Sequence, residues 1–231
     1  MKSSRIWDFW AGHYERLWVQ KWSLKPTREA VVEELKRLYQ EDETFTLLDV
    51  GCGVGELLEE IHEAFPKAKV YGLDYSIRMT EKSQKRVPEG IICHLAVEEL
   101  EIINKTIFPE EFDVILCTHS FPYYKDQQQI LKLFYRRLAR EGRLILAFAS
   151  ESTFYDRRVM PLVKLTTGNA AYPSKEKLRR MTRAHFTYEM EGNVAKHPWM
   201  PTLLFAVLKK QENHERHKDE CHKDERHKEV Q

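Results

Sequence analysis

The chain has 231 residues, is 42% apolar and carries a net charge of +1 at pH 7. This length suffices to bury a substantial core, most simply as one domain with a tail. A net charge near zero gives no bulk attraction to nucleic acid or to an anionic membrane. No apolar run approaches the roughly 20 residues that span a bilayer, and the start, MKSSRIWDFW, lacks a secretory apolar stretch. We therefore expect a cytoplasmic protein with neither a nucleic-acid nor a membrane partner.

Cysteine usage is consistent with a reducing compartment. Cys93 and Cys117 fall in apolar runs, Cys52 lies in a glycine-rich loop and Cys221 lies near the end of the chain. No pair has the spacing of a metal knuckle, so we expect free thiols, no disulfide framework and no metal site.

The first forty residues predict a helical cap. Helical spacing in residues 6–18 places four large apolar side chains on one face: Trp7, Trp10, Tyr14 and Leu17. Pro26 and Thr27 open a second helix, with its apolar face turned inward: Val31, Val32, Leu35 and Leu38. The aromatic first helix either covers a ligand or only anchors itself to the domain, and the sequence leaves both open.

Strand-like and helical segments then alternate. Apolar runs occupy residues 44–50, 68–74, 90–96, 112–118 and 142–149. Helical patterns follow most of them, and this alternation predicts a parallel sheet covered by helices on both faces. Residues 185–191 and 202–210 lie close together with no helix between them. They predict an antiparallel pair at one edge of the sheet.

The last segment, 212–231, has another composition. It contains a loose repeat of charged residues and histidines and only one valine, so it cannot bury a core. His217 and Cys221 have the spacing of one helix face and could bind a soft metal, but their Lys and Glu neighbours favour a solvated, disordered tail. We divide the chain into a cap (1–40), a main domain (41–211) and this tail.

A glycine-rich loop gives the main functional signal. Residues 47–58 read LLDVGCGVGELL, with Gly51, Gly53 and Gly55 directly after the first predicted strand. Open parallel sheets bind ligands at the carboxyl ends of their strands. One glycine would suffice for a tight turn, whereas three let a ligand approach where a Cβ would collide. The loop therefore predicts a nucleotide-type ligand.

The residues that flank the loop limit which class of ligand fits it. A dinucleotide fingerprint needs glycine where this chain has Glu56, and no Gly-Lys-Ser/Thr of a P-loop follows. Acids on both sides, Asp49 and Glu56, suit a ligand that carries a cation. Asp74 ends the second strand, where a carboxylate can accept hydrogen bonds from ribose hydroxyls; the alternative is a helix N-cap.

These motifs resemble those of class I S-adenosylmethionine-dependent methyltransferases. LLDVGCGVGELL resembles the family's first motif, D/E-x-G-x-G-x-G, and YGLDYSIRM, FDVILCTHSFPYY and LAREGRLILAFAS resemble its later strands in order. The resemblance covers about residues 40–210. It implies an α/β fold: a Rossmann-like, doubly wound, seven-stranded and mostly parallel sheet with an antiparallel last strand, three-layered, with an N-terminal helical cap.

The resemblance also implies roles for individual residues. The loop would hold the methionine end of S-adenosylmethionine, whose product is S-adenosylhomocysteine, Asp74 would hold the ribose, and His119 would lie near the sulfonium. Tyr75 and Met79 would lie near the adenine, although Met79 fits helix core equally well. The family's usual acid after the third strand falls on Ala96, so Glu98 or the amide of Val97 would replace it. The loop and cap residues implied are Asp49, Gly51, Cys52, Gly53, Gly55 and Tyr14.

Methyl transfer from a sulfonium needs positioning first, and a base only where the acceptor must lose a proton. The loop after the fourth strand offers His119 and Tyr123 as catalytic candidates, with Tyr124 as a further possible base. The two tyrosines fit a pocket wall better than a base. His119 could instead only line or cap the cavity.

The acceptor is less defined. The Asn or Asp that amino-group methyltransferases place after the fourth strand is Ser120 here, which favours another small molecule. The layout is most similar to the branch with quinone-biosynthesis enzymes. Within residues 152–178, four side chains could line an acceptor pocket: Phe154, Tyr155, Met160 and Leu162. Arg157 and Arg158 could bind an acidic acceptor, but a solvated role fits them better.

Two other functions remain open. A non-catalytic scaffold would keep the fold, and perhaps the cofactor, while binding a partner. A nicotinamide-dependent oxidoreductase is disfavoured by Glu56 and by the acid-flanked loop. We expect a monomer or a homodimer.

Overall fold

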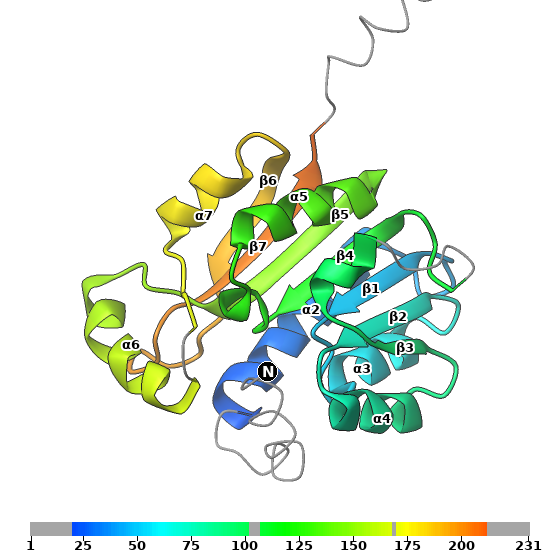
Figure 1. Ribbon diagram of the computed structural model, residues 1–231, viewed down its shortest axis with the longest axis horizontal. Helices are drawn as coiled ribbons and strands as arrows, with labels where there is room; N and C mark the ends of the chain where they lie inside the picture. Colours follow the sequence, from blue (N-terminus) through cyan, green and yellow to red (C-terminus); the bar gives the residue numbers. More distant parts are fainter. Residues whose placement is uncertain (1–19, 102–106, 168–169, 212–231) are drawn as a thin grey trace, which may run out of the picture.

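The structure, a computed structural model, describes residues 20–101, 107–167 and 170–211 (Figure 1). The predicted first cap helix, with Tyr14, and the tail at 212–231 lie outside the described residues. In the first half of the chain the elements are η2 (Gln20–Leu24), α2 (Lys25–Leu38), β1 (Thr46–Val50), α3 (Glu56–Ala64), β2 (Lys69–Asp74), α4 (Ile77–Arg86), β3 (Ile91–His94) and η3 (Val97–Glu101). The second half has β4 (Phe112–Thr118), η4 (Phe121–Tyr123), α5 (Gln127–Arg137), β5 (Leu138–Ala149), α6 (Phe154–Thr167), α7 (Lys175–Thr182), β6 (Phe186–Asn193) and β7 (Leu203–Lys210).

The strands form one seven-stranded sheet in the order β3-β2-β1-β4-β5-β7-β6. The first five strands in this order are parallel, and β7 runs antiparallel to both of its neighbours, β5 and β6. Helices α2 and α3 cover one face of the sheet, while α5 and α7 cover the other (Figure 1). The predicted three-layer, doubly wound fold with an antiparallel last strand is therefore confirmed.

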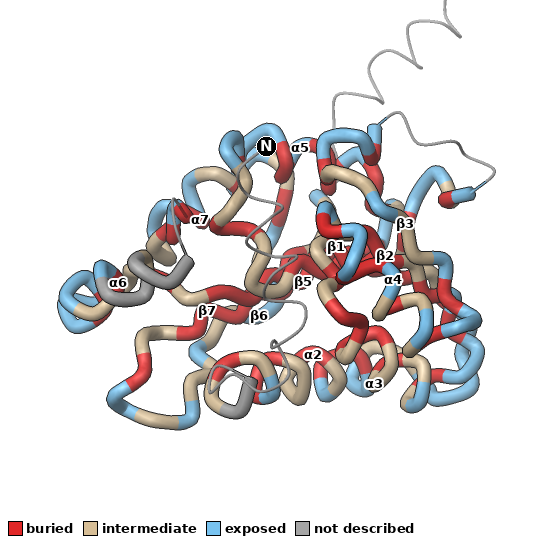
Figure 2. The backbone as a smooth tube through the Cα atoms, turned by 60° about the horizontal axis from the view of Figure 1, so that its bottom comes forward, coloured by how far each residue is buried: buried red, intermediate tan, exposed pale blue. Residues whose placement is uncertain are grey.

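The central strands are apolar throughout because both of their faces are covered. Leu47 packs with α2 and α3, whereas the next residue, Leu48, packs in the cluster that contains α5, and both are fully buried. Val114 and Ile115 of β4 repeat this alternation on the neighbouring strand. Figure 2 shows the buried strands through the middle of the molecule, with exposed residues on the outer sides of the helices. This two-sided burial explains why the sequence shows runs and no polar alternation.

Short polar side chains begin three of the helices. Ser76 caps α4 by accepting a hydrogen bond from the amide of Met79 at 3.3 Å, and Asp126 caps α5 in the same way. Ser174 caps α7 by accepting a hydrogen bond from the amide of Lys177. These caps satisfy amides that the first helical turn leaves without a partner.

Two elements differ from the expectations. Strand β5 begins at Leu138, four residues before the predicted run, because the segment after α5 pairs with Phe112 across an irregular register. The segment after β3 forms only the short helix η3, and residues 102–106 are outside the described part. Among the described residues, no helix is both long and apolar enough to cross a bilayer.

Candidate active site

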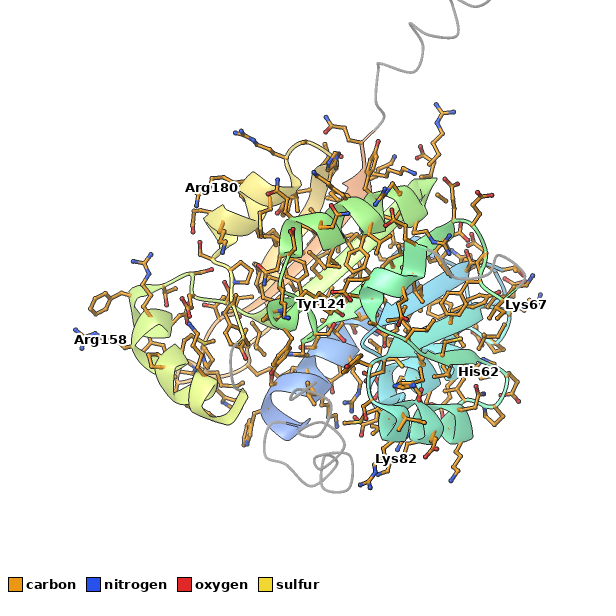
Figure 3. All side chains as sticks on the ribbon, in the orientation of Figure 1. His62, Lys67, Lys82, Tyr124, Arg158 and Arg180 are labelled. Atoms are coloured by element: carbon orange, nitrogen blue, oxygen red, sulfur yellow. The ribbon has the colours of Figure 1, made fainter. Side chains whose placement is uncertain are left out.

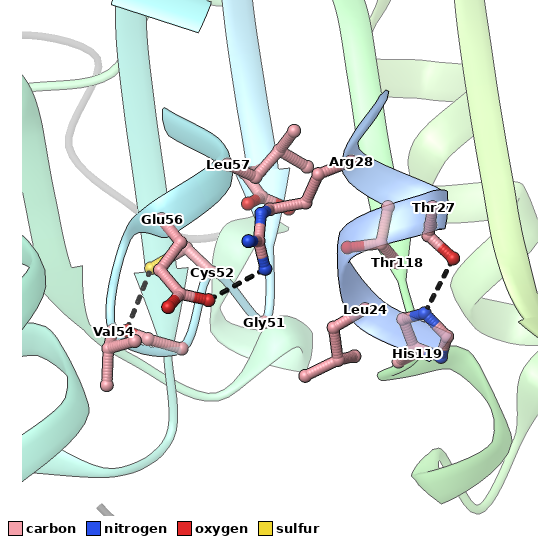
Figure 4. Close-up of a pocket in the computed structure, with 12 residues that line it drawn as sticks. Leu24, Thr27, Arg28, Gly51, Cys52, Val54, Glu56, Leu57, Thr118 and His119 are labelled. Atoms are coloured by element: carbon pink, nitrogen blue, oxygen red, sulfur yellow. Dashed lines mark hydrogen bonds and ion pairs between the residues drawn. The ribbon is translucent and has the colours of Figure 1, made fainter. Parts of the chain in front are cut away.

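The order of the strands reverses between β1 and β4, and the glycine loop and the loop after β4 lie at the carboxyl ends of these two strands. A ligand crevice is expected at this position in open parallel sheets. A pocket occupies this position (Figure 4). Its lining comes from three segments of the chain: Leu24, Thr27, Arg28, Asp49, Gly51, Cys52, Gly53, Val54, Glu56, Leu57, Thr118 and His119.

Each glycine of the loop has a positive φ, between 54° and 82°. The space around them differs. A Cβ on Gly51 would come within 2.5 Å of the Cβ of Ser120, and one on Gly55 within 2.4 Å of Oγ of Ser83. A Cβ on Gly53 would meet no protein atom within 4 Å. Gly51 and Gly55 are therefore required by packing, whereas Gly53 leaves space on the pocket side for a ligand.

Asp49 lies under this loop, 1% exposed. Its Oδ1 atom is one of the buried polar atoms of the described chain that have no hydrogen-bond partner. Burial, and secondarily the Asp74 carboxylate, raises the pKa of Asp49 to about 7. A buried carboxylate oxygen without a partner costs free energy, and a ligand with N–H donors or a positive charge would relieve that cost.

Asp74 lies at the end of β2 and binds two backbone amides. Its Oδ2 accepts from Gly53 at 3.0 Å and its Oδ1 from Ser76 at 2.8 Å. A carboxylate oxygen can accept more than one hydrogen bond, so these two bonds are compatible with a ligand role. The N-cap of α4 is Ser76, not Asp74.

Arg28 connects the cap helix to the glycine loop. Its guanidinium donates to Glu56 and to Glu60, both at 2.8 Å, and thereby ties α2 to α3 (Figure 4). Glu56 is therefore bound to a protein cation and is not the free acid that the loop sequence suggested. Sequence reasoning missed Leu24, Thr27 and Arg28 as pocket residues, since nothing local in the sequence shows that α2 packs against the loop.

His119 follows β4 and has φ 60°, the one positive φ among the described residues other than glycine. Its amide donates to the carbonyl of Ala147, and its Nε2 lies 3.0 Å from Oγ1 of Thr27. Burial in the pocket, with a smaller effect of the Arg28 charge, lowers the pKa of His119 to about 4. The imidazole is therefore neutral at pH 7.

The other catalytic candidates are placed differently. Tyr123 does not line the pocket and packs against the buried cluster of Met160, Ala170 and Tyr172. Tyr124 is partly buried against the core near the middle of the view in Figure 3, and its hydroxyl would be 3.6 Å from a Cβ on Gly51. Burial raises the pKa of Tyr124 well above its usual value, so this phenol stays protonated at pH 7.

The thiol of Cys52 also stays protonated, because burial raises its pKa well above the usual value. Its sulfur lies 3.9 Å from Oγ of Ser83, at the back of the loop. The side chain thus supports the loop and offers no nucleophile.

The residues expected near the adenine are spread outside this pocket. Met79 is buried against Val54, in agreement with its core role. Tyr75 is 47% exposed directly after Asp74, and its ring lies beside that of His94. Val97 is buried in the core, and Glu98 is exposed. None of these four residues lines the pocket. All of them follow β2 or β3 and so lie toward the same edge of the sheet as the pocket.

The residues proposed for the acceptor do not form a wall together. Phe154 and Tyr155 are 72% and 43% exposed, whereas Met160 is fully buried. The side chain of Leu162 is outside the described part. Arg158 on α6 and Arg180 on α7 point outward (Figure 3), in keeping with a solvated role for Arg158.

Comparisons with known proteins agree with this arrangement. The family described as "Methyltransferase domain" matches residues 48–144, from β1 to β5. Malonyl-(acyl-carrier protein) O-methyltransferase of Bacillus cereus is 26% identical over 133 residues, which are 57% of this chain and 48% of the relative. Demethylmenaquinone methyltransferase of Alkalihalophilus pseudofirmus is 27% identical over 158 residues, 59% of this chain and 67% of the relative.

A solved structure, magnesium protoporphyrin IX methyltransferase of Synechocystis PCC 6803 with bound S-adenosylhomocysteine, has the same fold. Its TM-score is 0.62 at 20% identity, covering 79% of this chain and 81% of that one. The chain spans about half the length of the first curated relatives that it matches. The family match at residues 48–144 contains the glycine loop and the strands β2, β3 and β4.

Proposed function

Because the chain carries a methyltransferase domain of the class I, S-adenosylmethionine-dependent family, we propose that it transfers a methyl group from S-adenosylmethionine to a small-molecule acceptor. The observation that carries this proposal is the free space beside Gly53. It adjoins Asp49, whose buried oxygen has no partner, and the amide of Gly53 is held by Asp74. A loop with this space and these two acids fits a ligand that has both a cation and a ribose.

Different residues would bind the methionine end, the ribose and the adenine of the cofactor. Gly51, Gly53 and Asp49 would hold the methionine end, where the ammonium group can satisfy the lone oxygen of Asp49. Asp74, at the end of β2, would accept hydrogen bonds from the ribose hydroxyls. Tyr75, being exposed beside Asp74, would cover the adenine.

The cofactor, when bound, supplies a methyl group that is already electrophilic on a sulfonium. The protein must then hold the acceptor in line and near 3 Å from it, which can supply roughly 7–11 kcal/mol of the barrier. His119 would contribute to this from the end of β4, where it lines the pocket together with Glu56 and Leu57. Its neutral imidazole can accept a hydrogen bond from an acceptor hydroxyl or amine.

The names of the relatives indicate different acceptors: a malonyl group on a carrier protein, a demethylmenaquinone and a magnesium porphyrin. They share the transfer of a methyl group and not the chemistry of the acceptor. We therefore keep the acceptor class at a small molecule or a small group on a carrier.

Calorimetric titration of the purified chain with S-adenosylmethionine, S-adenosylhomocysteine and NADH tests the proposal. We expect micromolar binding of the two sulfur compounds, no binding of NADH, and loss of binding in Gly53→Val. Absence of binding of both sulfur compounds to a folded wild-type chain would overturn the proposal and leave a scaffold that keeps only the fold.

A further inference from the structure

A single hydroxyl in the cap helix makes two hydrogen bonds. Thr27 is 1% exposed, and its Oγ1 lies 2.9 Å from the carbonyl oxygen of Ser23 and 3.0 Å from Nε2 of His119. A carbonyl oxygen only accepts, so the one proton of the hydroxyl is donated to Ser23. Oγ1 then has only lone pairs left for His119. For this contact to be a hydrogen bond, Nε2 must carry a proton.

The charge state of the ring determines whether Nδ1 carries a proton. At pH 7 the imidazole is neutral, because its pKa is lowered to about 4 by burial and by the Arg28 charge. A neutral imidazole carries one N–H, so a proton on Nε2 leaves a lone pair on Nδ1. Nδ1 makes no hydrogen bond with any described residue. It is also not among the described buried polar atoms that lack a partner, so it is not sealed off.

The backbone supports a fixed ring. His119 has φ 60°, a conformation that costs a residue with a Cβ roughly 1–2 kcal/mol. The amide of His119 is held by the carbonyl of Ala147 at 2.6 Å, so both ends of the residue are anchored. Strained residues that are held on both sides cluster at functional sites.

We propose that Thr27 is a positioning residue that fixes His119 as the Nε2–H tautomer and so presents Nδ1 as the hydrogen-bond acceptor of the active site. The use of Nδ1 toward a methyl acceptor rests on the proposed function, whereas the tautomer is a property of the free protein. The site then suits an acceptor that has an O–H or N–H group. Nδ1 would accept a hydrogen bond from that group and orient the acceptor, while the Nε2–H bond to Thr27 remains.

No described charged group near the ring fixes the tautomer of His119. Arg28 is bound to Glu56 and Glu60, and its charge opposes protonation of His119. Asp49 and Glu56 line the same pocket from β1 and α3, but neither hydrogen-bonds the imidazole. Of the described groups, only Thr27 distinguishes the two ring nitrogens.

The test is the tautomer, observed by two-bond ¹H–¹⁵N correlation NMR of the full chain, with the His119 signals identified by their loss in His119→Asn. In the wild type at pH 7 we expect a protonated, pyrrole-like Nε2 and an unprotonated, pyridine-like Nδ1. Thr27→Ser keeps the hydroxyl and should keep this pattern. Thr27→Val keeps the shape and removes the acceptor, so the two nitrogens should move toward averaged shifts.

A wild-type ring protonated at Nδ1, or an unchanged pattern in a folded Thr27→Val variant, would overturn the assignment. If Thr27→Val does not fold, the wild-type spectrum and Thr27→Ser still decide it. The calorimetric test of the cofactor is independent of this result. A correct tautomer without cofactor binding would refute the methyltransferase proposal alone, and cofactor binding with the wrong tautomer would refute only the role of Thr27.

Discussion

The amide of Gly53 donates to Oδ2 of Asp74 at 3.0 Å, and this bond joins the glycine loop after β1 to the end of β2. The same carboxylate holds the amide of Ser76 at the start of α4. Asp74 thus holds two turns, one in the glycine loop and one at the start of α4. Its removal should affect both the loop and the ribose site.

Asp74→Asn should weaken binding of S-adenosylmethionine by roughly 1–3 kcal/mol, because the amide cannot accept at both positions and carries no charge. Calorimetry measures the affinity, and thermal unfolding the stability. Asp126→Asn is the matched control, since Asp126 caps α5 by the same kind of bond outside the pocket. Equal affinity of the two variants would contradict the ribose role.

Alanine at two positions of the loop should separate packing from binding. Gly53→Ala meets no protein atom, so it should fold with a loss of about 1–2 kcal/mol for its positive φ and lose most cofactor affinity. Gly51→Ala places a Cβ 2.5 Å from that of Ser120 and should be clearly less stable than Gly53→Ala. Denaturant unfolding and titration of both variants measure this. A Gly53→Ala variant with normal affinity would show that the free space is not the ligand site.

Much of the fold follows from local signals. The runs at 44–50 and 112–118 predict β1 and β4 because burial on both faces makes these strands apolar throughout. The glycine loop is identified because the three positive φ values leave few other residue types. These features depend on neighbours in the sequence.

The rest of the site depends on contacts between distant segments. Thr27 contacts His119 across 92 positions, and Arg28 contacts Glu56 across 28. A helical pattern in α2 predicts which face is buried, but not which polar residue on its border reaches the pocket. For the same reason the exposure of Phe154 was not foreseen, since its apolar character fits a pocket wall and an outer surface equally well.

Cofactor binding should release protons from Asp49. A pKa of about 7 means that the carboxyl group is about half protonated at pH 7, and a bound cation favours the charged form. Titrations in buffers of different ionisation enthalpy should give a release of up to about half a proton at pH 7. The release should vanish at pH 9 and in Asp49→Asn. A buffer-independent enthalpy in the wild type at pH 7 would contradict it.

Asp49 should also lower the stability of the free protein at high pH. Its folded pKa is raised from 3.8 to about 7, so its folded form keeps a proton that the unfolded chain releases. Wild-type stability relative to Asp49→Asn should therefore fall as pH rises from about 4 to 7, by at most about 4 kcal/mol. Urea unfolding of both proteins between pH 4 and pH 8 measures the difference. A pH-independent difference would mean that Asp49 is charged throughout.

His119 should change the pH dependence of folding stability in the opposite direction to Asp49. Its folded pKa is lowered from 6.5 to about 4, so between these values the unfolded chain binds more protons than the folded one. Wild-type stability relative to His119→Asn should fall as pH drops from about 6.5 to 4, by up to about 3 kcal/mol. Asn is a suitable replacement because it tolerates the positive φ at this position. The same urea series measures it. A wild-type advantage that instead grows as pH drops would show that the folded site favours the imidazolium, and Nδ1 would then have no lone pair to offer an acceptor.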